Sequence, residues 1–290
     1  MTFLAKNAEL GGLSCAQQEA LVRLLDDDDP AISEAVQGRI LDCGEGALAW
    51  LKPHLLERNP AIRRKVTHLV ELIGRRGADD QFLAACLRRG EEFDLETAIW
   101  ALARTRYPGI NVGAYQALLD GYARDLETHL PTGGRAATLL AVINRYLFEQ
   151  LGYSGNEEDY YEPENSYLNR VMDRRLGNPV SLCILYLFVG RRLRIPLSGI
   201  GLPGHFVCRY QSPKEEVYID AFNSGRILSK ADCIRYLVQV SYGYQEGCFA
   251  PASPRRMLLR VCSNLHQIYH HQRNRQETQR LQRYVVALAR

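Results

Sequence analysis

His205 and Asp220 are two residues whose types and spacing can do acid–base chemistry. They lie in segments 205–210 and 215–220, in which apolar side chains alternate with others as in half-buried strands. The four residues between these segments can form a hairpin loop. With this loop His205 lies directly opposite Asp220, with Cβ atoms about 4.5–5.5 Å apart. A carboxylate in that position accepts one imidazole N–H and leaves the other ring nitrogen free to take a proton.

Such a pair suits cysteine-protease-like chemistry, in which the imidazole takes a proton from a thiol at a helix N-terminus. The structural alternative is a cross-strand His–Asp pair that only stabilises the hairpin. A helix is predicted from Pro179 to Gly190, and because it is apolar nearly all the way round it is expected inside a domain. Cys183 lies one turn into it, where apolar neighbours raise a thiol pKa, and Ser181 would need the base within hydrogen-bond reach.

The remaining cysteines and histidines give no metal site. The eight cysteines are scattered without a C-x-x-C pair, which is typical of small buried side chains in a cytoplasmic protein. His266 and His270 have the i, i+4 spacing of metal ligands, with His271 beside them, but no acidic residue lies close in sequence. No glycine-rich nucleotide signature is present, so neither a metal nor a cofactor is expected.

Composition and charge narrow the class of protein. The chain has 290 residues, of which 46% are apolar and 24% charged, so wholesale disorder is excluded. No apolar run is long enough for a membrane span, and the N-terminus does not read as a secretory signal, so a cytoplasmic location is expected. Residues 1–130 hold 15 Lys and Arg against 20 Asp and Glu, whereas residues 131–290 hold 21 against 13. This asymmetry indicates separate modules and is too weak to predict nucleic-acid binding.

The first part of the chain contains an internal repeat. Residues 29–36 fall on residues 59–66 when the sequence is shifted by thirty, and each copy opens with an N-cap candidate followed by proline. Apolar residues then recur at helical spacing. The pattern resembles HEAT-like helical repeats, which stack and leave a broad face for a partner.

Five short motifs follow in order along the rest of the chain. They are Leu-Gly-Tyr at 151–153, Asn-Ser-Tyr-Leu-Asn at 165–169, Gly-Asn-Pro at 177–179, Pro-Gly-His-Phe at 203–206 and Ile-Asp-Ala-Phe-Asn at 219–223. Together they resemble the SirB-type transglutaminase-like family, and the resemblance covers about residues 110–290. It implies a papain-like core, in which a central helix carries a nucleophilic cysteine and the following strands carry histidine and aspartate.

The resemblance carries over residue by residue. His205 matches the histidine of the triad and Asp220 its aspartate, but the position of the cysteine falls on Pro179. Cys183, one turn further along, corresponds to a buried small residue of the superfamily pattern. The cleft is expected around His205, Asp220 and the start of the Pro179 helix, and Asn165, Asn169 and Arg174 are candidates to line it.

These observations predict a mostly helical α+β chain in three parts: HEAT-like repeats over 1–126, a transglutaminase-like core with an antiparallel sheet over 127–250, and a TPR-like helical hairpin over 251–290. The favoured function is a non-catalytic module, regulatory in role, that binds a protein or peptide in the cleft. The alternative is a cysteine-dependent hydrolase or acyl transferase that uses Cys183 with His205 and Asp220. A third hypothesis, a helical adaptor with no working cleft, predicts that side chains fill the space beside His205.

Overall fold

The computed structural model describes residues 13–88, 93–131, 135–241, 243 and 246–290. The chain forms two compact units, one of residues 1–80 and 104–109 and the other of residues 81–103 and 110–290. Among the described helices, none combines the length and the apolar character that crossing a membrane requires.

The described residues of the first unit form helices and turns. Its helices are α1 (Cys15–Leu24), α2 (Pro30–Asp42), α3 (Leu48–Leu51) and the first part of α4 (Pro60–Leu87), with 3₁₀ turns at Gly44–Ala47 and Lys52–Leu56. The Asp29 side chain caps α2 by accepting the Ala31 N–H, and Asn59 does the same for Ala61 before α4. Val36, Leu69 and their apolar neighbours form one buried cluster, as the repeated helical spacing predicts.

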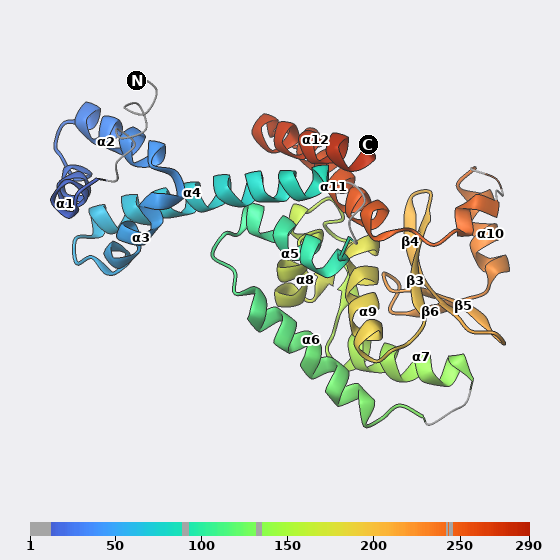
Figure 1. The fold of residues 1–290 in the computed structure, drawn as a ribbon. Helices are drawn as coiled ribbons and strands as arrows, with labels where there is room; N and C mark the ends of the chain where they lie inside the picture. Colours follow the sequence, from blue (N-terminus) through green and yellow to red (C-terminus); the bar gives the residue numbers. More distant parts are fainter. Residues whose placement is uncertain (1–12, 89–92, 132–134, 242, 244–245) are drawn as a thin grey trace, which may run out of the picture. The chain divides into compact units, whose positions relative to one another are not determined.

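The second unit combines helices with a sheet (Figure 1). Its helices are the end of α4, α5 (Leu95–Arg106, whose last residues belong to the first unit), α6 (Val112–Glu127), α7 (Ala136–Asn144), α8 (Leu168–Arg174), α9 (Pro179–Arg192), α10 (Lys230–Gln239), α11 (Pro254–His271) and α12 (Arg275–Ala289). The strands are β1 (Ser154–Gly155), β2 (Leu176–Gly177), β3 (Leu197–Leu202), β4 (His205–Gln211), β5 (Glu216–Asp220) and β6 (Arg226–Leu228). The mostly helical α+β class is therefore confirmed.

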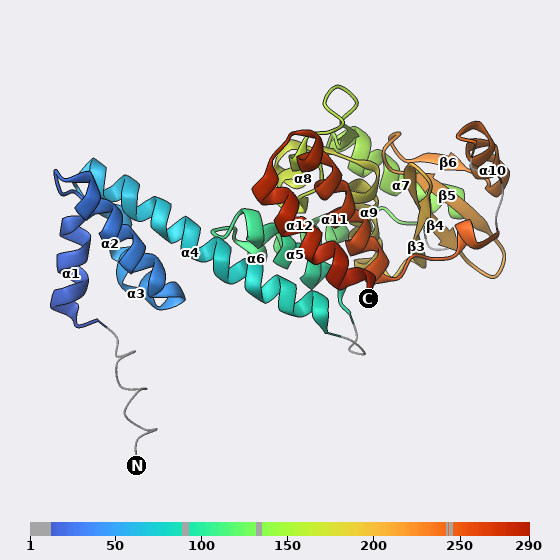
Figure 2. The same ribbon diagram turned by 90° about the horizontal axis from the view of Figure 1, so that it is seen from above.

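The main sheet is antiparallel, in the order β3-β4-β5-β6, and a helix packs on each face. Cys208 points toward α9, where its thiol donates to the Cys183 carbonyl. Val207 and Tyr218 point the other way and form a buried cluster with Leu237 of α10. Figure 2 shows α10 beside β5 and β6, at the end of the sheet away from the α11–α12 hairpin. The second unit thus holds both the predicted core and the C-terminal hairpin.

The predicted hairpin register is wrong by two residues. Tyr210 pairs with Val217 rather than with Glu215, and Cys208 pairs with Ile219. The reason is the turn, which spans residues 212–215. The Ser212 hydroxyl accepts the backbone N–H groups of Lys214 and Glu215, and the Ser212 N–H donates to the Glu215 carbonyl. A shift of two keeps every side chain on its predicted face.

Helix α9 occupies the centre of the second unit, as predicted. Every residue from Pro179 to Gly190 is buried. Asn178 caps the helix: its side chain accepts the Ser181 N–H, and the Ser181 hydroxyl accepts the Asn178 N–H, both at 3.0 Å. A helix that is buried on all sides needs both ends satisfied, because unpaired N–H groups there would have no water to bind.

Gly155, in the short strand β1, packs closely against Phe222, which follows β5. A Cβ at this position would lie 2.6 Å from the Phe222 ring and 2.7 Å from the Phe222 carbonyl oxygen. We expect Gly155→Ala to lower the free energy of unfolding by about 1–3 kcal/mol, because backbone must move to admit the methyl group. Urea unfolding measures the change.

The matched control is Gly121→Ala in α6, where the nearest atom to a new Cβ is an Arg124 side-chain nitrogen at 4.0 Å. This variant should stabilise by about 0.5–1 kcal/mol, because alanine is the better helix former. Equal effects of the two substitutions would contradict the packing described for Gly155.

Candidate functional site

His205 begins β4, directly after a two-residue turn. Leu202 pairs with His205, so Pro203 and Gly204 alone connect β3 to β4. Gly204 has φ +73°, in the left-handed region that favours glycine, and a Cβ there would lie 3.1 Å from the Tyr236 hydroxyl oxygen. That hydroxyl, on α10, donates to the Pro203 carbonyl at 2.9 Å. The turn and α10 together fix the position of His205 at the start of β4.

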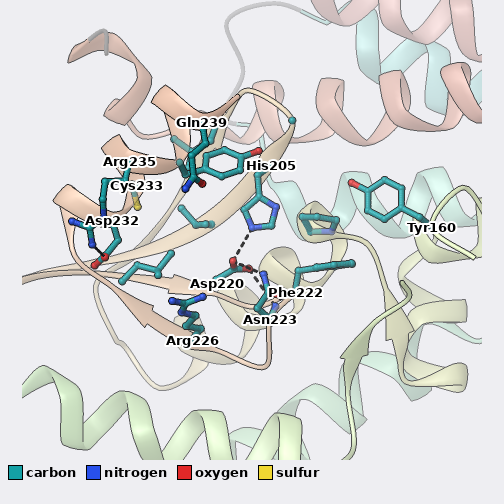
Figure 3. Close-up of a pocket in the computed structure, with 16 residues that line it drawn as sticks. Tyr160, His205, Asp220, Phe222, Asn223, Arg226, Asp232, Cys233, Arg235 and Gln239 are labelled. Atoms are coloured by element: carbon teal, nitrogen blue, oxygen red, sulfur yellow. Dashed lines mark hydrogen bonds and ion pairs between the residues drawn. The ribbon is translucent and has the colours of Figure 1, made fainter. Parts of the chain in front are cut away.

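Asp220 ends β5 and meets His205 across the sheet (Figure 3). The imidazole Nε2 lies 2.9 Å from Asp220 Oδ2, although the ring N–H is not aligned with that oxygen as in a good hydrogen bond. With the register shifted, the two residues are diagonal neighbours on one face, still within reach of each other. The predicted His205–Asp220 contact is present, and its predicted direct opposition is wrong.

The carboxylate of Asp220 is held in its charged form. The residue is 5% exposed, and Asn223 donates to it twice, from the side-chain amide at 2.7 Å and from the backbone at 3.3 Å. Burial acts to raise the pKa of Asp220, but His205 and Asn223 together outweigh burial and hold the pKa below its usual value. Asn223 ends the motif at 219–223, but the sequence analysis predicted no role for it in the site, although its place three residues after the aspartate is typical of a local side-chain-to-backbone contact.

The first turn of α9 faces the imidazole. Pro179, the first helical residue, lines two hollows together with His205. Cys183, one turn later, has no exposed surface, and its thiol donates to the Phe206 carbonyl at 3.4 Å. Burial, followed by the contact with Cys208, raises the pKa of the Cys183 thiol well above its usual value. A thiol in that state is neither ionised nor open to a substrate.

The two hollows meet at His205. The larger has a volume of about 590 Å³ and the smaller about 220 Å³, and both are lined by Tyr160, Pro179, Gly204 and His205. The larger lies between the sheet and α10, and the smaller extends toward α11. The space beside His205 is therefore open, contrary to what the hypothesis of an adaptor without a cleft predicts.

Cys233 of α10 is the cysteine that does line the larger hollow, among the described residues. It is 1% exposed, and burial raises the pKa of its thiol to about 12. Figure 3 shows Cys233 close to Asp232. A neutral thiol beside a carboxylate has none of the features that activate a nucleophile.

The three other predicted cleft residues lie outside the lining of both hollows. Asn165 is fully buried, where its side chain donates to the Asp159 carbonyl at 2.8 Å and its own carbonyl accepts the Ser181 hydroxyl at 2.6 Å. Asn169 of α8 is 2% exposed. Arg174 forms an ion pair with Glu164, with Nη1 3.5 Å from Oε2. Asn165 instead ties the 156–165 loop to the start of α9 through these two hydrogen bonds.

Tyr160 and Tyr236 line the cleft, and no motif pointed to them. Tyr160 comes from the loop before α8 and packs edge-on against Phe222, with ring centroids 5.8 Å apart. The ring centroids of Tyr236 and His205 lie 5.7 Å apart. Of the described residues, no three histidine, cysteine or carboxylate side chains gather as a metal site would need.

Residues 113–263, just over half of the chain, match the sequence signature of the transglutaminase-like superfamily. The chain belongs to this superfamily. The resemblance drawn from the motifs is confirmed, since the transglutaminase-like match spans the residues from α6 into α11 and includes His205, Asp220 and Pro179.

Several relatives share this transglutaminase-like region. A UPF0162 protein of Xylella fastidiosa is 38% identical over 186 residues, which make up 62% of this chain and 66% of that protein. A UPF0162 protein of Pseudomonas aeruginosa is 28% identical over 63% of this chain and 67% of its own length. F-box only protein 21 of Mus musculus is 34% identical over 44% of this chain and 21% of that protein. The chain thus spans just under two thirds of the Xylella relative, and no solved structure matches it.

The pKa of Asp220 predicts how stability depends on pH. Because the folded-state pKa is below the unfolded value, the carboxylate stabilises the fold above about pH 4, and this contribution is lost as pH falls through the folded pKa. Asp220→Asn should therefore lower the free energy of unfolding by about 1–3 kcal/mol at pH 7, with a difference from wild type that shrinks between about pH 5 and pH 3. Urea unfolding at several pH values measures this difference.

Glu158→Gln serves as the control, because Glu158 is an exposed residue of the second unit. It should change stability by less than about 0.5 kcal/mol at any of these pH values. A cost of Asp220→Asn that stays constant down to pH 3 would show that the charge of Asp220 does not matter to the fold.

Proposed function

We propose that this transglutaminase-like chain is a binding module that holds an extended protein segment in the cleft beside His205 and uses no cysteine nucleophile. The observation that carries the proposal is the position of Pro179. It occupies the first turn of α9 beside the imidazole, where a nucleophile would have to stand. A proline ring can neither lose a proton nor attack a carbonyl.

The alternative, a hydrolase or acyl transferase that uses Cys183, has little support in the geometry. Its thiol is fully buried and engaged by the Phe206 carbonyl, and its pKa is raised. Catalysis would require α9 to turn or slide by one helical turn, about 5.4 Å, through a tightly packed core. No described residue on the cleft side of α9 offers another activated thiol.

Without a nucleophile, the His205–Asp220 pair can act as a fixed polar anchor. Nε2 faces Asp220, so Nδ1 is the nitrogen left to meet a ligand in the cleft. Aromatic rings of Tyr160, Phe222 and Tyr236 stand around it. A cleft that combines apolar walls with a few fixed polar groups is the common form of a recognition site.

The flanking helices fit the same role. We infer that the helices of the first part are HEAT-like repeats and that α11 and α12 are a TPR-like hairpin, both of which are folds that dock partners on broad faces. A regulatory function would follow from these two features together with a cleft that binds without turnover.

Thiol chemistry tests whether the cleft lacks a nucleophile. In the native protein at neutral pH, Cys183 should resist iodoacetamide and label only after denaturation, whereas the exposed Cys15 should label at once. Pro179→Cys should place a thiol at the helix N-terminus beside His205 and label about tenfold faster than Cys15, because the helix dipole and the imidazole favour the thiolate. Peptide mapping by mass spectrometry identifies each labelled site.

His205→Ala provides the check on both results. It should slow labelling of the cysteine introduced at position 179 and leave Cys183 unaffected. Rapid labelling of Cys183 in the native protein that slows in His205→Ala would contradict the binding proposal and support the hydrolase or acyl transferase that uses Cys183.

Binding itself is tested by selection from a random library of twelve-residue peptides displayed on their own messenger RNA. The full-length protein should enrich a set of peptides over several rounds. Gln239→Trp, at an exposed position, and Asn264→Trp, at a partly exposed one, place an indole in either end of the cleft, and each should abolish or weaken the binding of the enriched peptides.

Gln282→Trp is the matched control, because Gln282 is exposed on α12 and does not line the cleft. It should bind the same peptides as the wild type. If no peptide is enriched, or if all three tryptophan variants bind equally well, the cleft is not a peptide site.

A further inference from the structure

A third hollow extends the cleft along α11. It has a volume of about 660 Å³ and shares Gly204, Phe206, Arg260, Asn264 and Gln267 with the smaller of the two hollows beside His205. The three hollows therefore form one groove, which we call the His205 groove. It starts between β6 and α10, passes His205 and Pro179 at its middle, and ends along α11.

The acidic side chains that line this groove already have partners. Asp220 is engaged by His205 and Asn223. Asp232 caps α10 by accepting the Ser229 N–H at 2.7 Å, and it also forms an ion pair with Arg235. Neither carboxylate is left to attract a cation from outside.

Three arginines of the same groove lack such partners. Arg226 lines one end and Arg256 the other, and both are exposed. Arg260 lines the groove with both His205 and Arg256, and its guanidinium donates to the Leu202 carbonyl at 3.4 Å. Among the described residues, none of the three forms an ion pair with a carboxylate. Guanidinium groups without a direct carboxylate partner thus stand on both sides of His205, although Arg226 is close enough to Asp232 to help lower the pKa of that carboxyl.

We infer that the segment bound in the His205 groove is acidic, with carboxylates on both sides of a neutral residue that lies next to His205. The inference rests on the proposed binding function and names the chemistry of the partner. Arginine holds a carboxylate through two parallel N–H···O bonds, and the arginines at the two ends would fix the direction and register of the segment. Asp220 beside the centre of the groove disfavours a negative charge there.

The order of positive and negative side chains along the His205 groove favours a peptide over a nucleic acid. A single strand of DNA or RNA carries a negative charge on every nucleotide and would have to place one beside Asp220 or Asp232. A peptide can place neutral residues at these points and acidic ones at the arginines. The aromatic side chains near His205 stand edge-on or tilted to one another, not as a continuous stacking platform.

The test uses the peptide selection described above. The enriched peptides should hold at least twice the aspartate and glutamate of the starting library, in two clusters separated by neutral residues. The strongest binder is then synthesised with a fluorescent label, alone and with every acidic residue changed to its amide. Fluorescence anisotropy with the full-length protein should show at least tenfold weaker binding of the amide form.

Charge variants locate the effect in the groove. Arg226→Gln combined with Arg260→Gln should weaken binding of the acidic peptide about fivefold or more and leave binding of the amide peptide unchanged. The control combines Arg64→Gln with Arg104→Gln, two exposed arginines outside the groove, and should bind both peptides as the wild type does. Raising the salt concentration should weaken only the acidic peptide.

The outcomes separate this inference from the proposed function. Enriched peptides that are neutral or basic, yet are lost in Gln239→Trp, would leave the peptide site standing and overturn its acidic preference. Tighter binding of a labelled twelve-nucleotide thymidine strand, lost in the arginine variant, would replace the peptide with nucleic acid. Binding of the acidic peptide that the arginine variant leaves unchanged would also overturn the inference, and a selection without any enriched peptide overturns both.

Discussion

The buried carboxylate of Asp220 is the constraint on which the rest of the site depends. A charge with 5% exposure is tolerated only when it is paired, and here the partners are an imidazole from β4 and an amide three residues further along its own chain. To bring these together, β4 must follow a two-residue turn and β5 must end where it does. The stability of the hairpin and the orientation of His205 are therefore consequences of the same contact.

The helix opposite that pair decides the chemistry. In this chain the first turn of α9 lies next to the imidazole, since Pro179 and His205 line the same hollows. Proline suits that position as a helix start and is useless there as a nucleophile. Since fold and function are set by different residues, a chain with proline at this position can keep its cleft while it loses a cysteine-based reaction. An open cleft with an intact His205–Asp220 pair is what such a loss would leave behind.

Sequence reasoning could predict the parts that follow from periodicity. The α9 boundaries follow from a cap, a proline and an unbroken apolar run, and the shared face of His205 and Asp220 follows from the alternation of two strands. The register could not be predicted, because it depends on whether Tyr210 and Glu215 or Gln211 and Glu216 form the last pair before the turn. Both alternatives have the same parity, so alternation alone cannot separate them.

The walls of the groove were beyond sequence reasoning for a different reason. Tyr236, Arg226 and Arg260 come from three elements whose own patterns describe an amphipathic helix, a short edge strand and a second helix. Each looks like an ordinary surface residue until α10 and α11 are placed beside the β3–β4 turn, where Tyr236 donates to the Pro203 carbonyl and Arg260 to the Leu202 carbonyl. Unbalanced charge is a property of the assembled surface, since an arginine counts as unpaired only after every neighbouring carboxylate has been assigned. Motifs therefore locate the reacting centre of such a domain, whereas the chemistry of its ligand has to be read from the folded groove.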